Sequence, residues 1–289
     1  MRVLATADLH YDVWRSRQPA ERLARRMLAA GGDVLILGGD TAGIDTEKLA
    51  QCLHLFARFP GRKLLVPGNH CIWVQPGQSS WDKYENILPL VADEHGFEYL
   101  DRQPALQDHV AFVGTMGWYD YSYRDQSLAI PQRFYTHKVA PGAAARLPCY
   151  QHLLDGYSDL SPQAASITAR WMDGQWVKWT FSDPQVTRLL VDRFAEHLRW
   201  AADRAQTIVA VTHHLPFARM LKKTGRPAWR FANAFMGSEL FGQAMLDQEK
   251  CRLAICGHSH RTDDLLIGHI RCVNIGSTYR HKRFTAFDF

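Results

Sequence analysis

Residues 33–40 read DVLILGGD, an apolar run that leads through two glycines to an aspartate. The run predicts a β-strand over residues 33–37, because it is short, apolar and bounded by a turn. The preceding residues, 18–32, carry apolar side chains on one side and arginines on the other, which predicts an amphipathic helix. Pro19 suits the first turn of that helix and Gly31 suits its end.

The alternation of strands and helices continues along the chain and predicts a mostly parallel sheet with helices on both faces. Residues 116–181 break the pattern with many aromatic residues and prolines, and they are too long for a plain connection. We expect one domain over residues 1–289, in which this insertion is either a lid or a structural cap. Further strands are predicted at 2–7, 62–66, 109–115, 207–212 and 252–256, helices at 46–57, 81–95 and 183–203, and antiparallel strands at 263–268, 270–276 and 283–289.

Polar side chains follow five of the predicted strands at the point where each strand ends. Each motif alone is typical of a helix cap, a turn or a core histidine, but ligands of open α/β sheets bind beyond the carboxyl ends of parallel strands. Five such ends in one sheet therefore indicate one site. The residues are Asp8 and His10, Asp40, Asn69 and His70, His213 and His214, and His258 and His260.

The donor set indicates the chemistry of this site. Two carboxylates, an amide oxygen and at least three imidazoles exceed the four ligands of a tetrahedral zinc, and they suit two metal ions that share a carboxylate. Such a pair can hold the attacking and leaving oxygens of a phosphoryl displacement. Nitrogen and oxygen donors without thiolate favour manganese, iron or zinc, with cobalt or nickel as alternatives, over magnesium.

Five motifs occur in the order DLH (8–10), GGD (38–40), GNHC (68–71), THHLP (212–216) and GHSH (257–260), and together they resemble the calcineurin-like metallophosphoesterase superfamily. The resemblance implies a four-layer α/β/β/α sandwich of mixed sheets, with a dinuclear metal site at the carboxyl ends of the strands. It implies two ligand sets that share a bridging Asp40. One set is Asp8, His10, Asp40 and His260, and the other is Asp40, Asn69, His213 and His258.

The resemblance also implies catalytic roles. A hydroxide that bridges the metals would attack phosphorus beside Asp40, and His70 would steady the phosphate or protonate the leaving oxygen. His213 is predicted as the ligand rather than His214, because the family's ligand is the first residue after the strand. His214 would then either face the substrate or pack in the interior. Cys71 replaces the acid that usually follows this motif, which changes the surroundings of His70.

The loop after His214 supplies candidate substrate contacts. Its basic residues could meet phosphates and its tryptophan could stack on a base, although a solvated basic loop is the alternative. The tetrad RHKR (280–283) is predicted to be solvated. The phosphoprotein phosphatase motifs GDxVDRG and HGG are missing, which favours the diesterase and general phosphoesterase branches. The candidate substrate contacts are His214, Lys222, Lys223, Arg226 and Trp229.

These features predict a phosphoesterase that acts on a phosphodiester or a nucleotide-like phosphate. The alternatives are a nuclease acting on DNA or RNA, a phosphomonoesterase or protein phosphatase, and a metal-binding scaffold without catalysis. The net charge of +5 and pI near 8.9 fit a small phosphorylated substrate without favouring nucleic acid. The sequence shows no secretory signal, no membrane span and no CxxC pair, which predicts a cytoplasmic protein with reduced thiols. It does not predict the oligomeric state.

Overall fold

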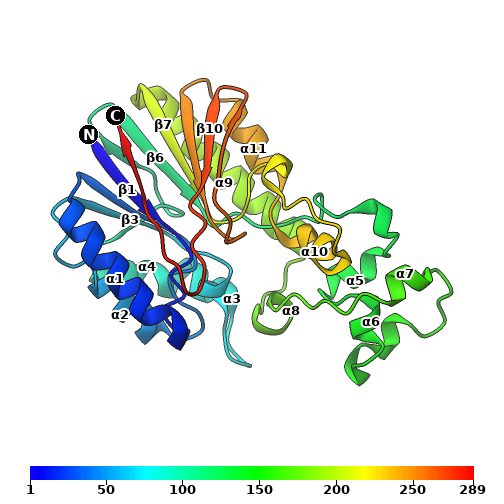
Figure 1. The fold of residues 1–289 in the computed structure, drawn as a ribbon. Coiled ribbons are helices and arrows are strands. Elements are labelled where there is room, and N and C mark those ends of the chain that lie inside the picture. Colours follow the sequence, from blue (N-terminus) through cyan, green and yellow to red (C-terminus); the bar gives the residue numbers. More distant parts are fainter.

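The computed structural model describes all 289 residues, and two packed β-sheets lie at its centre (Figure 1). In the first sheet β1 to β4 run parallel and β11 pairs antiparallel with β1. In the second, β6, β7, β8 and β10 run parallel, with antiparallel β5 and β9 at the edges. In spatial order the first sheet comprises β11 (Thr285–Asp288), β1 (Arg2–Thr6), β2 (Val34–Gly38), β3 (Arg62–Val66) and β4 (Glu98–Tyr99). The second comprises β5 (Ala105–Gln107), β6 (Val110–Thr115), β7 (Thr207–Thr212), β8 (Cys251–Cys256), β10 (Ile270–Asn274) and β9 (Asp263–Ile267).

Helices cover the outer face of each sheet (Figure 1). Helices α1, α2 and α4 lie on the first sheet, and α9 and α11 lie on the second. The helices are α1 (Trp14–Ala30), α2 (Thr46–His54), α3 (Ser80–Asp82), α4 (Leu88–Glu94), α9 (Asp183–Arg204), α10 (Pro227–Ala232) and α11 (Glu239–Leu246), with a π-helical turn over Lys83–Ile87.

Alternate residues of each strand face two different cores, as the pleat of a β-strand requires. On β2, Ile36 belongs to a cluster of 18 buried residues between the sheets, which also contains Val211 of β7. Its neighbours Leu35 and Leu37 face the helices and belong to the larger outer core. The four-layer α/β/β/α sandwich is therefore confirmed. The strand–helix alternation alone predicted one sheet, and that was wrong because a second sheet, rather than a second helical layer, covers the inner faces.

Several element boundaries differ from the sequence predictions. Helix α1 begins at Trp14, so Pro19 lies inside the helix rather than in its first turn, whereas Gly31 does end it with φ of 60°. The segment 270–276 was predicted to be antiparallel, but β10 pairs parallel with β8 and antiparallel only with β9. The short strands β4 and β5 were not predicted.

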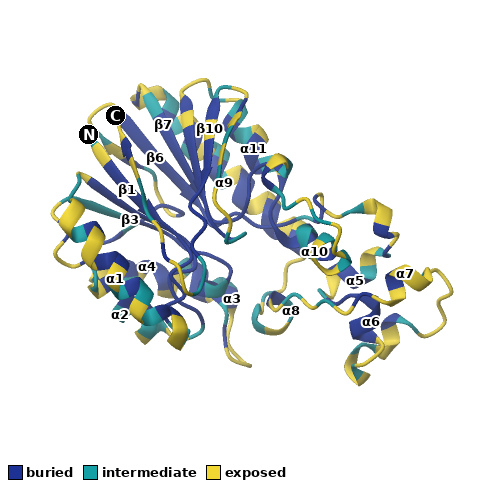
Figure 2. Cartoon of the chain, in the orientation of Figure 1, coloured by how far each residue is buried: buried dark blue, intermediate teal, exposed yellow.

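The insertion 116–181 extends from the sandwich as short helices (green in Figure 1). They are α5 (Gln132–Thr136), α6 (Pro141–Ala144), α7 (Pro162–Ala165) and α8 (Asp173–Trp176). Figure 2 shows exposed residues on the outer turns of this segment, whereas Trp118 and Tyr119 are fully buried at its base. Two aspartates, Asp173 and Asp183, are also buried there. The insertion therefore packs into the same outer core as the helices, and its base lies near the ends of the strands.

Candidate metal centre

The residues that follow β1, β2, β3, β7 and β8 meet at one edge of the sandwich, with Asp40 in the middle. Its Oδ2 atom lies 3.3 Å from Nε2 of His213, 3.6 Å from Nε2 of His10 and 4.0 Å from Nε2 of His70. Its Oδ1 atom accepts the backbone N–H of His70 at 2.9 Å. The backbone thus fixes one carboxylate oxygen and leaves the other directed at three imidazoles.

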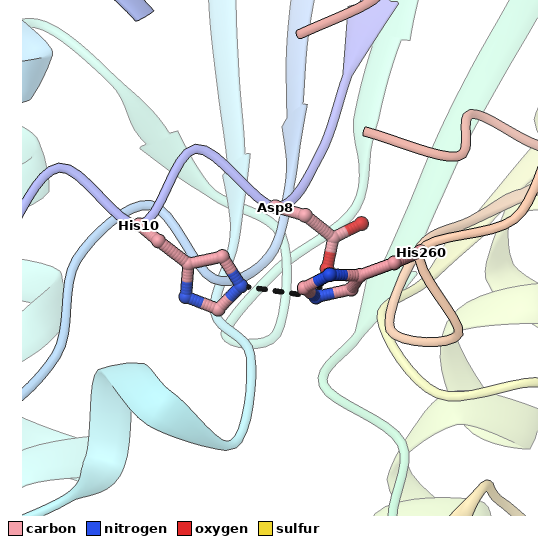
Figure 3. A group of neighbouring side chains, drawn as sticks. All are labelled: Asp8, His10 and His260. Carbon is pink, nitrogen blue, oxygen red and sulfur yellow. Dashed lines mark hydrogen bonds and ion pairs between the residues drawn. The ribbon is translucent and has the colours of Figure 1, made fainter. Parts of the chain in front are cut away.

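The first ligand group consists of Asp8, His10 and His260, whose ligand atoms all lie within 4.8 Å of one another (Figure 3). Nε2 of His260 lies 3.2 Å from Nε2 of His10 and 3.5 Å from Oδ1 of Asp8. The rings come from positions 250 residues apart in the sequence. The parallel strands β1 and β8, which lie in different sheets, bring them together at their carboxyl ends.

The second ligand group contains Asp40, His213 and His258, whose ligand atoms all lie within 4.8 Å of one another. The sequence predicts Asn69 as its fourth member. Ring nitrogens of two of its members contact backbone carbonyls, Nδ1 of His213 at Gly38 (3.1 Å) and Nε2 of His258 at Phe235 (3.2 Å). Because a carbonyl only accepts, these nitrogens donate, and the other nitrogen of each ring carries a lone pair whenever that ring is neutral. Those nitrogens face each other across 3.2 Å. Two facing lone pairs beside a carboxylate suit a cation or a shared proton.

Burial and charge set the protonation of these groups. Although burial opposes it, the neighbouring imidazoles of His213, His70 and His10 hold the pKa of Asp40 well below its usual range. Burial lowers the pKa of His10 and of His258 well below the ordinary value, so both are neutral near pH 7. His213 differs, because the carboxylates of Asp40 and Asp8 outweigh burial and raise its pKa to about 9. The proton on His213 therefore occupies a position where a bound cation would replace it.

Five of the seven predicted ligands have a left-handed backbone. The φ angles are 58° at Asp8, 44° at His10, 49° at Asp40, 65° at His258 and 56° at His260. This conformation costs a residue with a side chain roughly 1–2 kcal/mol. Residues in such conformations cluster at functional sites, where the surrounding structure holds them in place.

Glycine precedes Asp40 because of the close approach of His213. A Cβ atom on Gly39 would lie 2.2 Å from Nδ1 of His213, and the φ of this residue is 98°. The GGD motif therefore allows strand β2 to end directly beneath a ligand from strand β7.

Two oxygen atoms that could bind metal are buried without any hydrogen-bond partner. They are Oδ2 of Asp8 and Oδ1 of Asn69. An unsatisfied buried polar atom costs about 1–3 kcal/mol. Divalent cations with mixed oxygen and nitrogen ligands would satisfy both atoms, so the residues present fit the metals that the donor set predicts.

A cleft of about 500 Å³ opens beside the two groups, and both His70 and His260 line it. The His70 side chain is 19% exposed and its ring stacks on Trp73 at 3.7 Å between centroids. Sequence reasoning missed most of the cleft wall, because most of these residues do not directly follow a strand. The wall residues that were not predicted are Asp12, Val13, Trp73, Arg170, Trp171, Met172, Asp173, Met236, Ser259 and Tyr279.

Of the five predicted substrate contacts, only Trp229 lines the cleft. His214 is buried, its Nδ1 donates to the carbonyl of Met116 at 3.0 Å, and burial lowers its pKa to about 3. Nζ of Lys222 lies 4.3 Å from the ring centroid of Trp229, outside the cleft wall. The remaining two, Lys223 and Arg226, are exposed away from the wall.

Two residues near the centre have unexpected surroundings. Lys282, in the tetrad that was predicted to be solvated, is buried and its Nζ donates to the backbone carbonyl of Asp8 at 2.5 Å. Cys71 is buried, and burial raises the pKa of its thiol to about 11. A neutral thiol therefore stands beside His70, where the resembling family usually has an acid.

Comparison with known proteins decides the family. The model of the calcineurin-like phosphoesterase family matches residues 1–262. The chain belongs to this family. It is thereby grouped with metal-dependent phosphate-ester hydrolases, and its candidate ligand groups agree with that assignment.

Solved structures share the fold at low sequence identity. Phosphopantetheinyl hydrolase from Mycobacterium tuberculosis superposes with a TM-score of 0.66 at 17% identity, covering 98% of this chain and 95% of that one. A dimetal phosphatase from Danio rerio superposes with a TM-score of 0.55 at 12% identity, covering 99% and 91%. A comparison with curated protein sequences finds no match. None of the helices in this chain is long and apolar enough to cross a membrane.

Proposed function

We propose that the protein is a dinuclear metal-dependent phosphodiesterase that acts on a small phosphodiester. The observation that carries this proposal is the position of Asp40. Its free oxygen lies between the two ligand groups, within 4.0 Å of imidazole nitrogens from three different strand ends. One carboxylate can therefore serve two adjacent cations, and its pKa keeps it charged at neutral pH.

Two divalent ions in these groups would supply an activated water and neutralise the charge on the phosphoryl oxygens. The protein's own residues do the rest. His70 lies at the floor of the cleft, held by its stacking on Trp73, and it can donate a proton to the leaving oxygen. At neutral pH His10 and His258 are neutral and Asp40 is charged, so these three ligands are ready to bind, whereas His213 must release its proton to a bound cation.

The composition of the cleft wall favours a diester over a monoester. Arg170 is the only lysine or arginine on the wall, whereas Trp171, Met172 and Trp229 offer apolar surface beside the metal ligands. A diester carries a single negative charge and a second organic group that this surface can cover. We propose Trp229 as a substrate contact, whereas the positions of His214, Lys222, Lys223 and Arg226 give their predicted contacts no support.

The test is a comparison of matched aryl esters with the Mn²⁺-loaded protein. We expect kcat/KM for bis(p-nitrophenyl) phosphate to exceed that for p-nitrophenyl phosphate by at least about tenfold, a difference of about 1.4 kcal/mol in transition-state binding. Equal or inverted values would remove the diester preference. No cleavage of any ester while both metals are bound would remove the hydrolase assignment.

A wider panel then addresses the natural substrate class. It should include cyclic nucleotides, glycerophosphodiesters and a phosphopantetheinylated peptide, the last because a solved relative with the same fold is a phosphopantetheinyl hydrolase. The Asp40→Asn variant serves as the control in every assay.

A further inference from the structure

Asp173 is a buried carboxylate that the insertion places against the metal centre. It is the first residue of α8, is 1% exposed, and lines the floor of the cleft. No strand leads to it, and the proposed metal ligands do not include it.

Four donors converge on this carboxylate. Oδ1 accepts from Nδ2 of Asn69 at 2.8 Å and from Nε1 of Trp73 at 2.8 Å. Oδ2 accepts from Nε1 of Trp171 at 2.7 Å and from the hydroxyl of Tyr119 at 3.1 Å. An indole N–H cannot accept a hydrogen bond, so two of the four neighbours, Trp73 and Trp171, fix one acceptor position on each oxygen of Asp173.

This arrangement decides which way the amide of Asn69 points. The amide donates through Nδ2 to Oδ1 of Asp173 at 2.8 Å, so its nitrogen faces Asp173 and its oxygen faces away from it. Oδ1 of Asn69 is buried and has no protein partner. The amide with its oxygen turned toward Asp173 would place two acceptors against each other, and the second ligand group would then present an NH₂ group that cannot bind a cation.

We propose that Asp173 is a positioning residue for the second ligand group, because it locks the Asn69 oxygen toward the bound cation. The same carboxylate holds the indole of Trp73, which stacks on His70 at an interplanar angle of 24°. The insertion is therefore part of the metal centre as well as a cap. This inference rests on the proposed dinuclear function and assigns a role within it to a residue outside the strand ends.

Metal titration of the full-length, metal-free protein tests the proposal. Isothermal titration with Mn²⁺ should show two sites in the wild type. In Asp173→Ala the first should keep its affinity and the second should weaken by about 10–100-fold, the usual effect of losing an outer partner of a ligand. Visible absorption of the Co²⁺-loaded protein should show the loss of one of the two sites.

Asp183 provides the matched control. It is also buried at the base of the insertion, where it accepts from Nε1 of Trp118 at 2.8 Å and from Nζ of Lys138 at 2.6 Å, but it touches no predicted ligand. Asp183→Ala should lower the unfolding midpoint and leave both Mn²⁺ affinities within about twofold. An equal loss of the second site in both variants would mean that Asp173 acts only through stability, and it would overturn the proposal.

An exchange variant keeps the proposal testable if Asp173→Ala does not fold. Asn69→Asp alone places two carboxylates together and should weaken the second site. Combining it with Asp173→Asn restores an amide donor opposite a carboxylate once Trp73→Phe removes the indole N–H that would otherwise oppose that donor. Relative to Asn69→Asp with Trp73→Phe, this triple variant should recover at least about tenfold of the lost affinity. No recovery would overturn the proposal. A wild type that binds two metals but cleaves no ester would instead overturn the proposed function and leave the role of Asp173 intact.

Discussion

The two ligand groups of the metal centre are held in different ways. In the first group, Asp8, His10 and His260 follow two strands, and the His260 side chain remains 25% exposed beside the ring of Tyr279. Every member of the second group is buried, and the insertion contacts it directly. Trp171 lies edge-on to His258 at 5.6 Å between centroids, and Asp173 accepts from Asn69.

The difference shows that two parts of the protein, the strand ends and the insertion, position the ligands of one site. The strand ends place the ligand backbones, and for the first group this placement nearly completes the arrangement. The second group contains an amide whose two ends differ chemically but are alike in shape, so its orientation needs a further partner. We infer that the metal centre depends on the insertion only at its second ligand group.

The largest expected effect is that of Asp40→Asn, because this carboxylate is common to both groups. The variant should lose affinity at both sites, and hydrolysis should fall by on the order of 10³-fold, since the buried charge that balances three imidazoles is gone. Metal content by mass spectrometry and kcat/KM on the aryl diester measure this. If one metal stayed bound at full affinity, Asp40 would not be shared, and the two groups would be independent sites.

His70→Ala should separate catalysis from metal binding. His70 lies 4.0 Å from Asp40 on the exposed side of the centre, so both metals should remain bound. The rate should fall by about 10²–10⁴-fold as expected for a lost general acid. Alkyl diesters, which have poor leaving groups, should suffer more than p-nitrophenyl diesters. Loss of a metal in this variant would instead identify His70 as a ligand, since ligand atoms of His70, His10 and Asp40 also lie within 4.8 Å of one another.

The parts of the fold and site that follow strands could be predicted from sequence. The strand at 62–66 and the strand at 207–212 have the predicted bounds. Residues after those strands, such as Asn69 and His213, lie where the carboxyl ends of parallel strands must meet. This works because a short apolar run fixes both the strand and its end. The ends of β3 and β7 meet because the two sheets pack face to face, which the one-sheet prediction did not include.

The contribution of the insertion could not be predicted in the same way. Asp173 lies in the segment WMDGQW, where neither a strand nor a turn pattern indicates its direction. Its place depends on aromatic packing over 116–181, which has no period to extrapolate. Lys282 could not be predicted for a similar reason. A basic tetrad predicts solvated side chains, but the loop after β10 turns the side chain of Lys282 inward, where it donates to the backbone carbonyl of Asp8.

The anchor of the insertion predicts a pH effect on stability. Asp101 accepts the backbone N–H of Met116 at 2.7 Å and the hydroxyl of Tyr84, and burial raises its pKa from 3.8 to about 6. The folded state therefore binds this proton more tightly than the unfolded state. The stabilisation is complete below pH 3.8 and is lost as the pH rises through about 6, amounting to at most about 3 kcal/mol.

Asp101→Asn isolates this effect from the other titrating groups. Urea unfolding of the wild type and the variant at pH 4, 5, 6 and 7 gives the difference in the free energy of unfolding. We expect the variant to gain relative to the wild type between pH 4 and 6 and the difference to level off above that range. A difference that does not change with pH would show that the pKa of Asp101 is not raised, and that the insertion is anchored by a carboxylate that stays charged over this range.

The smallest expected effect concerns the backbone of the first ligand group. The insertion does not contact this group, so we expect its left-handed residues to be strained. His260 has a φ of 56° and a partly exposed side chain. His260→Gly and His260→Ala both remove the ligand, but glycine adopts this φ at no steric cost whereas alanine does not. In the metal-free state His260→Gly should exceed His260→Ala in free energy of unfolding by about 1 kcal/mol, measured by urea unfolding. Equal stabilities would mean that the strand end relaxes once the imidazole is removed. In that case the left-handed backbone of the first group would be a consequence of its ligands, and the strand ends alone would not preorganise even this half of the centre.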